Sequence, residues 1–378
     1  MVFSSLFFIF LYLPVILFLY YIVPSRTWKN LILILASLTF YAWGEPVWVS
    51  LLIFSATIDY FHGLLVEKYR GKWQSKLGLA SSLVLNLSLL AIFKYMGMFV
   101  ESFNALSGLQ IQYHSFSLPI GISFYTFQTI SYVIDVYQGK AEAQRSFLKF
   151  FMYVSLFHQL VAGPIVRYKD IAREIEERVF HISVFAEGIR RFVIGLSKKV
   201  ILANTAGEVA KNFLEQDFTQ MSMAGFWAGM ILFAFQIYYD FSGYSDMAIG
   251  LGKMFGFTYK ENFNYPYISK SATEFWRRWH ISLGTFFREC VYIPLGGNRK
   301  HHFRNILIVW FLTGLWHGAS WNFVLWGMYY GVLLLIEKYL GKMKLFHIIP
   351  AAFKHIYLVI ITVFGWTLFY FEEMDQVL

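Results

Sequence analysis

A histidine in a long uncharged segment is the strongest chemical signal in this sequence. From Asn305 to Ile336 there is no Asp, Glu, Lys or Arg, and His317 is the only histidine. An ionisable side chain is costly in such a segment, so it tends to face a cavity or to carry function. Burial favours the neutral imidazole, which is the form that a general base requires. We interpret His317 as a candidate base; the alternative is a histidine that packs between helices and bonds a carbonyl group.

A second histidine lies in the segment with the densest mixture of charged and aromatic residues, Asn262–Arg299. Ser271 and Glu274 have the spacing of a capping box, which predicts a helix start. The recurrence at i, i+3, i+4 and i+7 predicts one face made of Trp276, Trp279, His280, Leu283, Phe286 and Phe287. Arg277 and Arg288 are predicted to share another face, because three helical turns separate them. The helix is predicted to end near Pro294, before a turn at Gly296, Gly297 and Asn298.

From the residues alone, His280 is interpreted as a capped histidine held between aromatic side chains. The helix that carries it is expected to lie along the membrane interface or to dip into the protein. Two carboxylates precede it, Asp240 and Asp246, at the end of an uncharged run. They either pair with the arginines of the next segment or orient a catalytic histidine. His158 lies in a further apolar stretch, where a polar packing role is expected.

Other kinds of site have little support in the sequence. His301 and His302 are adjacent, so their side chains diverge on a helix, and no cysteine or carboxylate stands at a zinc-binding spacing. We therefore predict no metal site. Cys290 is the only cysteine, which excludes an internal disulfide and a thiolate cluster. The sequence contains no phosphate-binding loop, dinucleotide fingerprint or nucleophile elbow, so no tightly bound cofactor is expected.

The composition indicates a membrane protein. Hydrophobic residues make up 57% of the 378 residues and charged residues only 15%, whereas soluble domains hold about 25% charged residues. The net charge of +9 resides in short loops between apolar runs, which indicates topology rather than nucleic-acid binding. We expect no nucleic-acid partner, because no binding motif accompanies the charge.

The apolar runs predict an all-α bundle of transmembrane helices, because backbone in lipid must satisfy its own hydrogen bonds. We expect nine or ten crossings, and a single membrane domain over residues 1–378, since no linker or short repeat is visible. A span needs about 20 residues, and several candidates are short enough to be re-entrant. The candidates are 2–23, 30–43, 47–66, 77–99, 116–137, 147–166, 185–205, 218–239, 305–320, 321–337 and 354–371.

Loop charges predict the orientation. Basic residues cluster at 26–29, 68–76 and 140–149, whereas residues 100–115 contain no Lys or Arg. The positive-inside rule then places these basic loops in the cytoplasm and the N-terminus outside. The first run, 2–23, lacks the basic n-region of a signal peptide and is predicted to be a retained span. Mixed charges over 167–191 suit an interfacial amphipathic helix.

The two histidine segments resemble the membrane-bound O-acyltransferase (MBOAT) superfamily, in particular its alginate O-acetyltransferase (AlgI-like) branch. The resemblance covers nearly the whole chain. The matching stretches are QIYYDFSGYSDMAIGLGKMFGF at 236–257, ENFNYPYISKSATEFWRRWHISLGTFFRECVYIPLGGNRK at 261–300, LTGLWHGASWNFVLWG at 312–327, FHQLVAGPIVRY at 157–168 and LPIGISFYTFQTISYVIDVY at 118–137. Members of this family usually continue with further membrane helices, so this chain is short at its C-terminus relative to the family.

The resemblance implies a helix bundle around a central funnel or tunnel, with shorter helices in the membrane plane. It places the family's invariant histidine at His317 and its second histidine at His280. It also implies an acetyl group that passes from a cytoplasmic donor, acetyl-CoA or another acyl carrier, towards an exported polysaccharide. A periplasmic or extracellular SGNH-like acetyltransferase is the expected partner. The chain itself is expected in the inner membrane of a bacterial cell.

Three hypotheses of function remain at this point. The first is an O-acetyltransferase with His317 as the base and His280 holding either the acyl carbonyl or the acceptor. The second is transfer of D-alanine to teichoic acid, as in a related branch, and the third is a transporter or flippase. The residues expected to bind substrate are Trp316, Trp279, Arg277, Arg278, Asp240 and Asn264.

Overall fold

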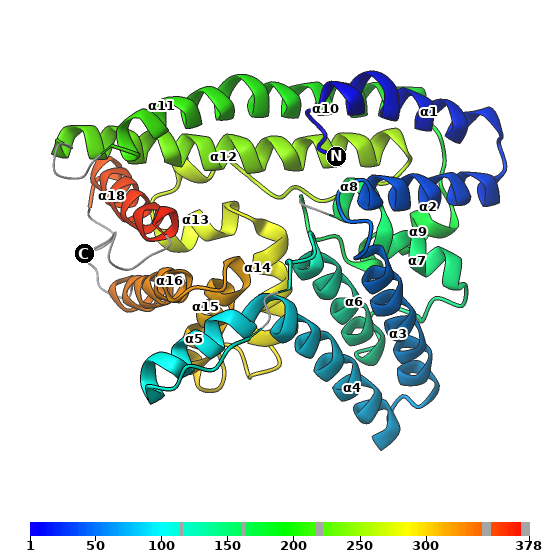
Figure 1. Cartoon of the computed structure of the whole chain (residues 1–378), viewed down its shortest axis with the longest axis horizontal. Helices are drawn as coiled ribbons and strands as arrows, with labels where there is room; N and C mark the ends of the chain where they lie inside the picture. Colours follow the sequence, from blue (N-terminus) through cyan, green and yellow to red (C-terminus); the bar gives the residue numbers. More distant parts are fainter. Residues whose placement is uncertain (114–115, 161–162, 217–221, 342–348, 372–378) are drawn as a thin grey trace. The chain divides into compact units, whose positions relative to one another are not determined.

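The computed structural model describes residues 1–113, 116–160, 163–216, 222–341 and 349–371, and these residues form helices and no strand. The prediction of an all-helical fold is therefore confirmed (Figure 1). The chain divides into two compact units. The first contains Met1–Leu196 and Tyr244–Lys260, and the second contains Ser197–Gly243 and Glu261–Leu378. The prediction of a single membrane domain is not tested by this division and stays a prediction.

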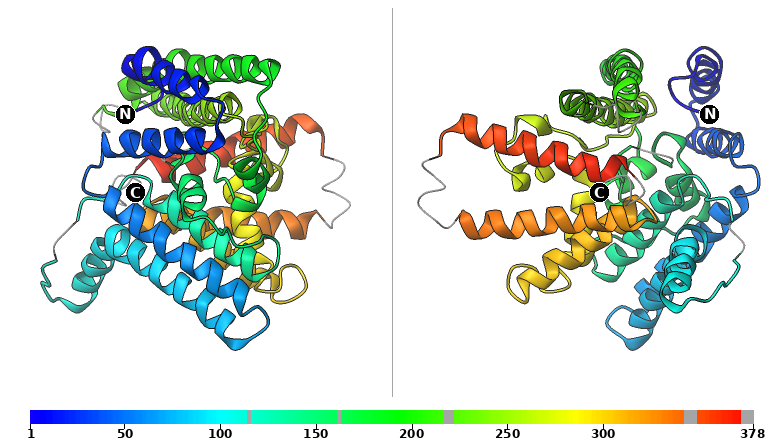
Figure 2. Two further views of the ribbon diagram at one scale, coloured as in Figure 1. Left: turned by 90° about the vertical axis from the view of Figure 1, so that its right-hand side faces the viewer. Right: turned by 60° about the vertical axis from the view of Figure 1, so that its left-hand side comes forward.

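The first unit is built from helices of the N-terminal half of the chain. Its helices are α1 (Leu13–Ile22), α2 (Arg26–Ala42), α3 (Val49–Lys68), α4 (Trp73–Leu90), α5 (Met96–Ser107), α6 (Ile122–Tyr137), α7 (Phe147–Ser155), α8 (Phe157–Leu160), α9 (Tyr168–Glu176) and nearly all of α10 (Ile182–Ser197). A π-helical stretch, Phe8–Tyr12, precedes α1, and another, Ala91–Tyr95, joins α4 to α5. Helices α3, α4 and α6 pack on one another, and Figure 2 shows α3 and α4 side by side.

A polar network lies inside this group of three helices. Asp59 of α3 is fully buried and accepts hydrogen bonds from Ser82 Oγ, at 2.6 Å, and from Asn86 Nδ2, at 2.7 Å. His62, one turn later on α3, places Nδ1 3.2 Å from Asp59 Oδ1 and Nε2 2.9 Å from the Ser81 hydroxyl. Buried polar groups cost free energy unless they are paired, so this network ties α3 to α4.

The second unit contains the two histidine segments. Its elements are π-helix Lys198–Ala203, α11 (Asn204–Leu214), most of α12 (Met223–Met254), the 3₁₀ turn Pro266–Ile268, α13 (Ala272–Arg278), α14 (Ile281–Phe287), π-helix Arg288–Tyr292, α15 (His302–His317), α16 (Trp321–Leu340) and α18 (Ala351–Tyr370). Helix α16 contacts both α15 and α18. A Cβ atom at Gly314 or at Gly327 would collide with the backbone of the facing helix. The small residues near His317 therefore let the backbone of α16 approach closely.

Four helices of the described residues are long and apolar enough to cross a membrane: Val49–Lys68, Trp73–Ser107, Trp321–Leu340 and Ala351–Tyr370. A shorter apolar helix, Phe8–Ile22, lies within the first predicted span. These helices confirm a polytopic helical membrane protein. The expected nine or ten crossings include shorter segments, and that number stays a prediction.

Two predicted spans differ from the helices observed. The segment 147–166 is not one helix, because the chain breaks at Leu156 between α7 and α8; residues 161–162 lie outside the described part. The segment 218–239 begins outside the described residues, and its helix starts at Met223 and continues to Met254. Asp240 and Asp246 thus lie inside α12 rather than after a span. The charged stretch after Val166 contains an amphipathic helix, α9, which buries Tyr168, Ile171 and Ile175.

Candidate active site

The helix predicted from Ser271 onwards is broken at His280. Its start is confirmed, since Ser271 Oγ accepts a hydrogen bond from the Glu274 N–H at 3.0 Å. However, α13 ends at Arg278, Trp279 is extended, and His280 has left-handed backbone angles, φ 46° and ψ 53°. The single aromatic face predicted for this segment is therefore wrong, because its members are divided among α13, the break at Trp279 and His280, and α14.

Tertiary hydrogen bonds explain the break. The loop before α13 runs beside it, so the Asn264 N–H donates to Arg278 O and the Ile281 N–H donates to Asn262 O, both at 2.9 Å. These bonds replace helical bonds on either side of His280. A non-glycine residue in the left-handed region persists only where its surroundings determine it. The sequence pattern could not reveal this competition, because the partner residues lie outside the helix.

The imidazole of His280 is enclosed by uncharged groups. The residue is 2% exposed, and its ring packs against Phe241 of α12 and Trp316 of α15, with centroids 4.7 Å and 5.6 Å away. Nδ1 lies 3.2 Å from Asn262 Oδ1, whereas Nε2 is buried with no hydrogen-bond partner among the residues described. Burial lowers the pKa of His280 to about 3, so its imidazole is neutral at physiological pH.

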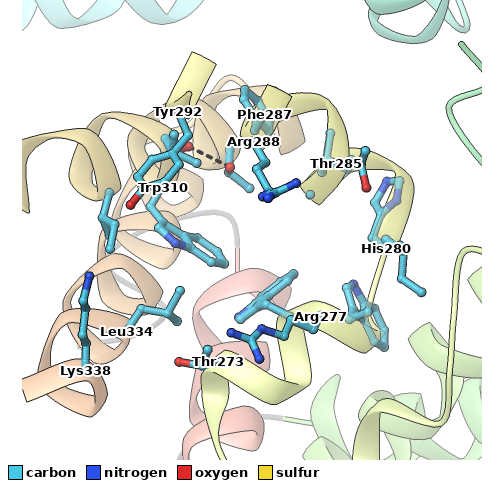
Figure 3. A pocket seen from close by; sticks show the side chains of 18 of the residues that line it. Thr273, Arg277, His280, Thr285, Phe287, Arg288, Tyr292, Trp310, Leu334 and Lys338 are labelled. Carbon is cyan, nitrogen blue, oxygen red and sulfur yellow. Dashed lines mark hydrogen bonds between the residues drawn. The ribbon is translucent and has the colours of Figure 1, made fainter. Parts of the chain in front are cut away.

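A pocket of about 770 Å³ lies in the second unit, with His280 in its wall. Arg277 of α13 and Arg288, which follows α14, both line it (Figure 3). The two arginines were predicted to share a helix face; they lie instead on separate elements, and the break at His280 brings both to one cavity. Aromatic rings form much of the remaining wall, including Trp276, Trp279 and Trp310. Such a cavity suits a ligand with an apolar body and anionic groups.

A buried carboxylate fixes the helix that presents Arg277. Glu337 of α16 accepts hydrogen bonds from the N–H groups of Ala272 and Thr273, at 2.5 Å and 2.8 Å, and from the Thr273 hydroxyl, at 2.6 Å. These are donors at the N-terminus of α13, where a negative charge is favourable. Glu337 is the only acidic residue between Cys290 and Phe371. Its isolation in an apolar helix was a signal for this structural role, although Glu337 was not singled out in the sequence.

A ring of hydrogen-bonded polar side chains lines the pocket, and Figure 3 shows two of its members, Tyr292 and Lys338, on the side away from His280. The Lys338 ammonium lies 2.7 Å from His302 Nε2 and 3.0 Å from Asn298 Oδ1. The Tyr292 hydroxyl lies 2.8 Å from His302 Nδ1 and 2.9 Å from Asn298 Oδ1. This ring joins the turn at Gly296-Gly297, where both glycines have positive φ as the predicted turn requires, to α15 and α16.

The other histidine, His317, is the last residue of α15 and does not line this pocket. Its ring packs against Trp316, Trp326 and Phe369, with centroids 4.9 Å, 4.7 Å and 5.4 Å away. Thr313, one helical turn earlier, is a lining residue. Trp316 contacts the rings of both histidines, so one indole connects His280 with His317.

The remaining predicted site residues divide into two groups. Trp279 lines the pocket with Arg277. Outside it lie Arg278, which pairs with Glu274 at 2.9 Å, Asp240, which pairs with Lys199 at 2.9 Å, and Asn264, which is exposed. Asp240 thus forms an ion pair, but with a lysine that precedes it in the chain, whereas the prediction named arginines of the next segment. A substrate role for these three side chains stays a prediction.

Two further polar residues lie in the first unit. Asp246 accepts a hydrogen bond from Arg191 Nε at 2.8 Å. This arginine precedes Asp246 in the chain, whereas the prediction named arginines of the next segment. The buried His158 places Nδ1 2.7 Å from the Tyr259 hydroxyl, as a polar packing role requires. Neither contact belongs to the pocket of the second unit.

Asn262 was not singled out in the sequence, although its side chain reaches His280. Its Oδ1 lies 3.2 Å from His280 Nδ1, 3.0 Å from the Ser282 backbone nitrogen and 2.8 Å from the Ser282 hydroxyl. The sequence contains Asn262 and Asn264 two residues apart, and Asn264 was the asparagine predicted to bind substrate. No local pattern separates the two asparagines, since only the fold decides which one faces the histidine.

Comparison with known proteins agrees with these features. The sequence model of the membrane-bound O-acyltransferase family matches residues 33–371. The chain is similar to the probable alginate O-acetylase AlgI of Azotobacter vinelandii, with 42% identity over 99% of this chain and 76% of that protein. It is 35% identical to the peptidoglycan O-acetyltransferase of Helicobacter pylori, over 92% of this chain and 72% of that protein. The teichoic acid D-alanyltransferase of Streptococcus thermophilus is 28% identical, over 60% of this chain and 58% of that protein.

Proposed function

Because the chain belongs to the membrane-bound O-acyltransferase family and is an acyltransferase, we propose that it moves an acetyl group from a cytoplasmic donor to an exported or cell-surface polysaccharide. The similarity to alginate and peptidoglycan O-acetyltransferases, which extends over nearly the whole chain, supports acetyl as the group transferred. The weaker and shorter similarity to a D-alanyltransferase makes D-alanyl transfer the alternative. The bacterial cytoplasmic membrane is the proposed location.

The observation that carries this proposal is a neutral, buried histidine in the wall of a large cavity. His280 has an unprotonated form at physiological pH and lies in the same pocket wall as two arginines, Arg277 and Arg288. In acyl transfer an imidazole can accept the proton of the attacking hydroxyl group, and cationic side chains can bind the anionic groups of the donor. The pocket combines both, within one unit of the chain.

In the proposed reaction, a histidine removes the proton from a hydroxyl group as its oxygen attacks the acetyl carbonyl carbon. The bond between that carbon and the donor sulfur breaks, and the leaving thiolate takes up a proton. His317 is the proposed base, on the strength of the family resemblance, and His280 holds either the carbonyl or the hydroxyl. Trp316 supports a shared role, because it contacts both rings.

The donor proposed for this pocket is acetyl-CoA or another acyl carrier with a phosphorylated arm. Guanidinium groups bind phosphate by paired, charge-assisted hydrogen bonds, and Arg277 and Arg288 supply two of them. The aromatic side chains Trp276, Trp279 and Trp310 offer surface to the apolar part of the arm. An SGNH-like acetyltransferase outside the cell is the proposed partner that completes transfer to the polysaccharide.

The test uses bacterial cells that depend on this chain for acetylation of their surface polysaccharide. Cells fed labelled acetate should place label in O-acetyl esters of the polysaccharide, and His317→Ala should lower that label about 10²–10⁴-fold. An immunoblot of the membrane fraction checks that the variant still inserts. Normal labelling by His317→Ala would remove His317 as the base, and labelled D-alanine in place of acetate would overturn the acetyl assignment.

A further inference from the structure

We infer that Asn262 is a positioning residue that holds His280 with its proton on Nδ1, so that Nε2 accepts a hydrogen bond from the attacking hydroxyl group. The inference rests on the proposed function and decides between the two roles left open for His280. A histidine that polarises a carbonyl must donate from Nε2, whereas a histidine that binds a hydroxyl group accepts there. The contacts of Asn262 permit only the second.

The amide oxygen of Asn262 determines which nitrogen of His280 carries the proton. A backbone N–H can only donate, and the Ser282 nitrogen lies 3.0 Å from Asn262 Oδ1, so the atom at that position is the accepting oxygen. The Ser282 hydroxyl lies 3.4 Å from His280 Nδ1 but donates its proton to Asn262 Oδ1, which is 2.8 Å away. His280 Nδ1 lies 3.2 Å from the same oxygen. Two acceptors would repel one another at that distance, so Nδ1 carries the proton and donates. In a neutral imidazole the other nitrogen, Nε2, then has a free lone pair.

The surroundings hold the ring in this state. Asn262 is fully buried, and its backbone carbonyl accepts the Ile281 N–H at 2.9 Å, so the asparagine is bonded to His280 and to the two residues that follow it. The rings packed against the imidazole, those of Phe241 and Trp316, are uncharged. The charged side chains that share its pocket are Arg277, Arg288, Lys338 and Glu337, and burial of the ring disfavours its protonated form.

Nε2 is left for a ligand. It is buried, and the described residues offer it no hydrogen-bond donor. A buried acceptor without a donor is destabilising. His158 Nε2 is also buried without a partner, but His280 differs because it lines the pocket, where a ligand can supply the donor. A hydroxyl group of the acceptor, in line with the proposed reaction, provides that donor and is held for attack.

The decisive measurement is the protonation of each ring nitrogen of His280. The full chain is labelled with ¹⁵N-histidine, reconstituted in bilayers and studied by solid-state NMR, with the His280 resonances assigned by their loss in His280→Gln. We expect protonated Nδ1 and bare Nε2 from pH 5 to pH 8. A proton on Nε2, or an imidazolium form near pH 6, would overturn the inference whether or not the protein acetylates polysaccharide.

Variants of Asn262 link this state to turnover. Asn262→Ala removes the acceptor and should lower kcat for acetyl transfer from labelled acetyl-CoA about 10- to 100-fold in membrane vesicles, with KM for the donor unchanged. Asn262→Asp keeps the acceptor and adds a charge, so it should restore most of kcat but introduce an acid limb near pH 6 to 7. Ser282→Ala removes the hydroxyl that lies near both side chains but keeps the backbone bond to Asn262. It should retain the wild-type pH profile, because Asn262 and not Ser282 holds the ring.

The outcomes separate the inference from the proposed function. Wild-type kcat in Asn262→Ala, or an Asn262→Asp profile identical to that of the wild type, would contradict a positioning role. If Asn262→Ala is too unstable to isolate, the NMR state of His280 in the wild type and in Asn262→Asp still decides the question. Absence of any acetyl transfer by the wild-type protein would count against the proposed function alone.

Discussion

His62 in the first unit and His280 in the second differ in how their ring nitrogens are engaged. His62 contacts Asp59 through Nδ1 and the Ser81 hydroxyl through Nε2, so both nitrogens lie within hydrogen-bond distance of a side chain of the same network. His280 contacts Asn262 through Nδ1 alone, and Nε2 has no donor within the described part of the chain. A histidine whose nitrogens are both occupied joins helices, whereas one with a held ring and a bare nitrogen can bind a reactant.

The groups that orient the two rings also differ. Asp59 of α3 is an acidic residue that accepts hydrogen bonds from two side chains of the neighbouring helix α4, so it belongs to a network that joins two helices. Asn262 is neutral, and its amide oxygen accepts hydrogen bonds from His280 and from the Ser282 backbone N–H. A neutral partner orients an imidazole without favouring its protonation. This contrast predicts that changes around His62 alter stability and changes around His280 alter turnover.

The largest expected effect comes from removing the two histidines in turn. His280→Gln should lower acetyl transfer about 10²–10⁴-fold, because the reacting hydroxyl group loses its acceptor. His62→Gln is the matched control and should keep turnover per folded molecule within about twofold of the wild type. Initial rates in membrane vesicles, corrected for protein amount by immunoblot, measure both. Equal losses in the two variants would break the comparison.

Asp59→Ala should be the most destabilising of the changes considered in the first unit. It removes the acceptor of Ser82 and Asn86, which are buried, and should lower the free energy of unfolding by about 2–3 kcal/mol. Asp59→Asn, which preserves size and one accepting oxygen, should cost less. Unfolding in mixed micelles measures both variants, and acetyl transfer per folded molecule should stay at the wild-type level. A stable Asp59→Ala protein without activity would place chemistry in the first unit.

The arginines of the pocket offer a matched pair of smaller changes. Arg277 lines the cavity, whereas its neighbour Arg278 pairs with Glu274 outside it. Arg277→Gln should raise KM for labelled acetyl-CoA about tenfold with kcat little changed, since it removes a charge-assisted contact to the donor. Arg278→Gln should leave KM within about twofold. A larger effect from Arg278 would show that the donor does not use this pocket.

The smallest expected effect is a pH dependence of stability. Burial lowers the pKa of His280 to about 3, whereas the unfolded residue titrates near about 6.5. Between these values the unfolded chain binds more protons, so the free energy of unfolding falls as the pH drops below about 6.5. At pH 5.5 the loss from His280 should be about 1 kcal/mol. Unfolding at pH 7.5 and 5.5 should show this loss in the wild type and a smaller one in His280→Gln.

Local patterns in the sequence predicted the helical class and several boundaries. Apolar runs and low charge indicated membrane helices, because lipid leaves the backbone no other partner. The capping box at Ser271 predicted the start of α13, and the glycine pair at Gly296-Gly297 predicted the turn after Pro294. These signals act within a few residues, so the sequence contains them in full.

Longer-range partners decided what the patterns could not. The periodicity from Trp276 to Phe287 predicted one continuous helix, but backbone bonds from Asn262 and Asn264 break it at His280. The same break places Arg277 and Arg288 on one pocket although they do not share a helix. Helical periodicity describes only bonds within the segment, so it cannot show where a neighbouring loop replaces them.

The sequence by itself determined that this protein is a helical membrane protein with two histidines in a recognisable acyltransferase context. Only the tertiary structure decided which groups contact these segments. Asn262 rather than Asn264 lies beside His280, and Glu337 accepts hydrogen bonds from the N-terminus of α13. The physical reason is that the protonation state of an imidazole depends on the atoms within hydrogen-bond distance. Those atoms come from residues far apart in the chain, which folding alone brings together.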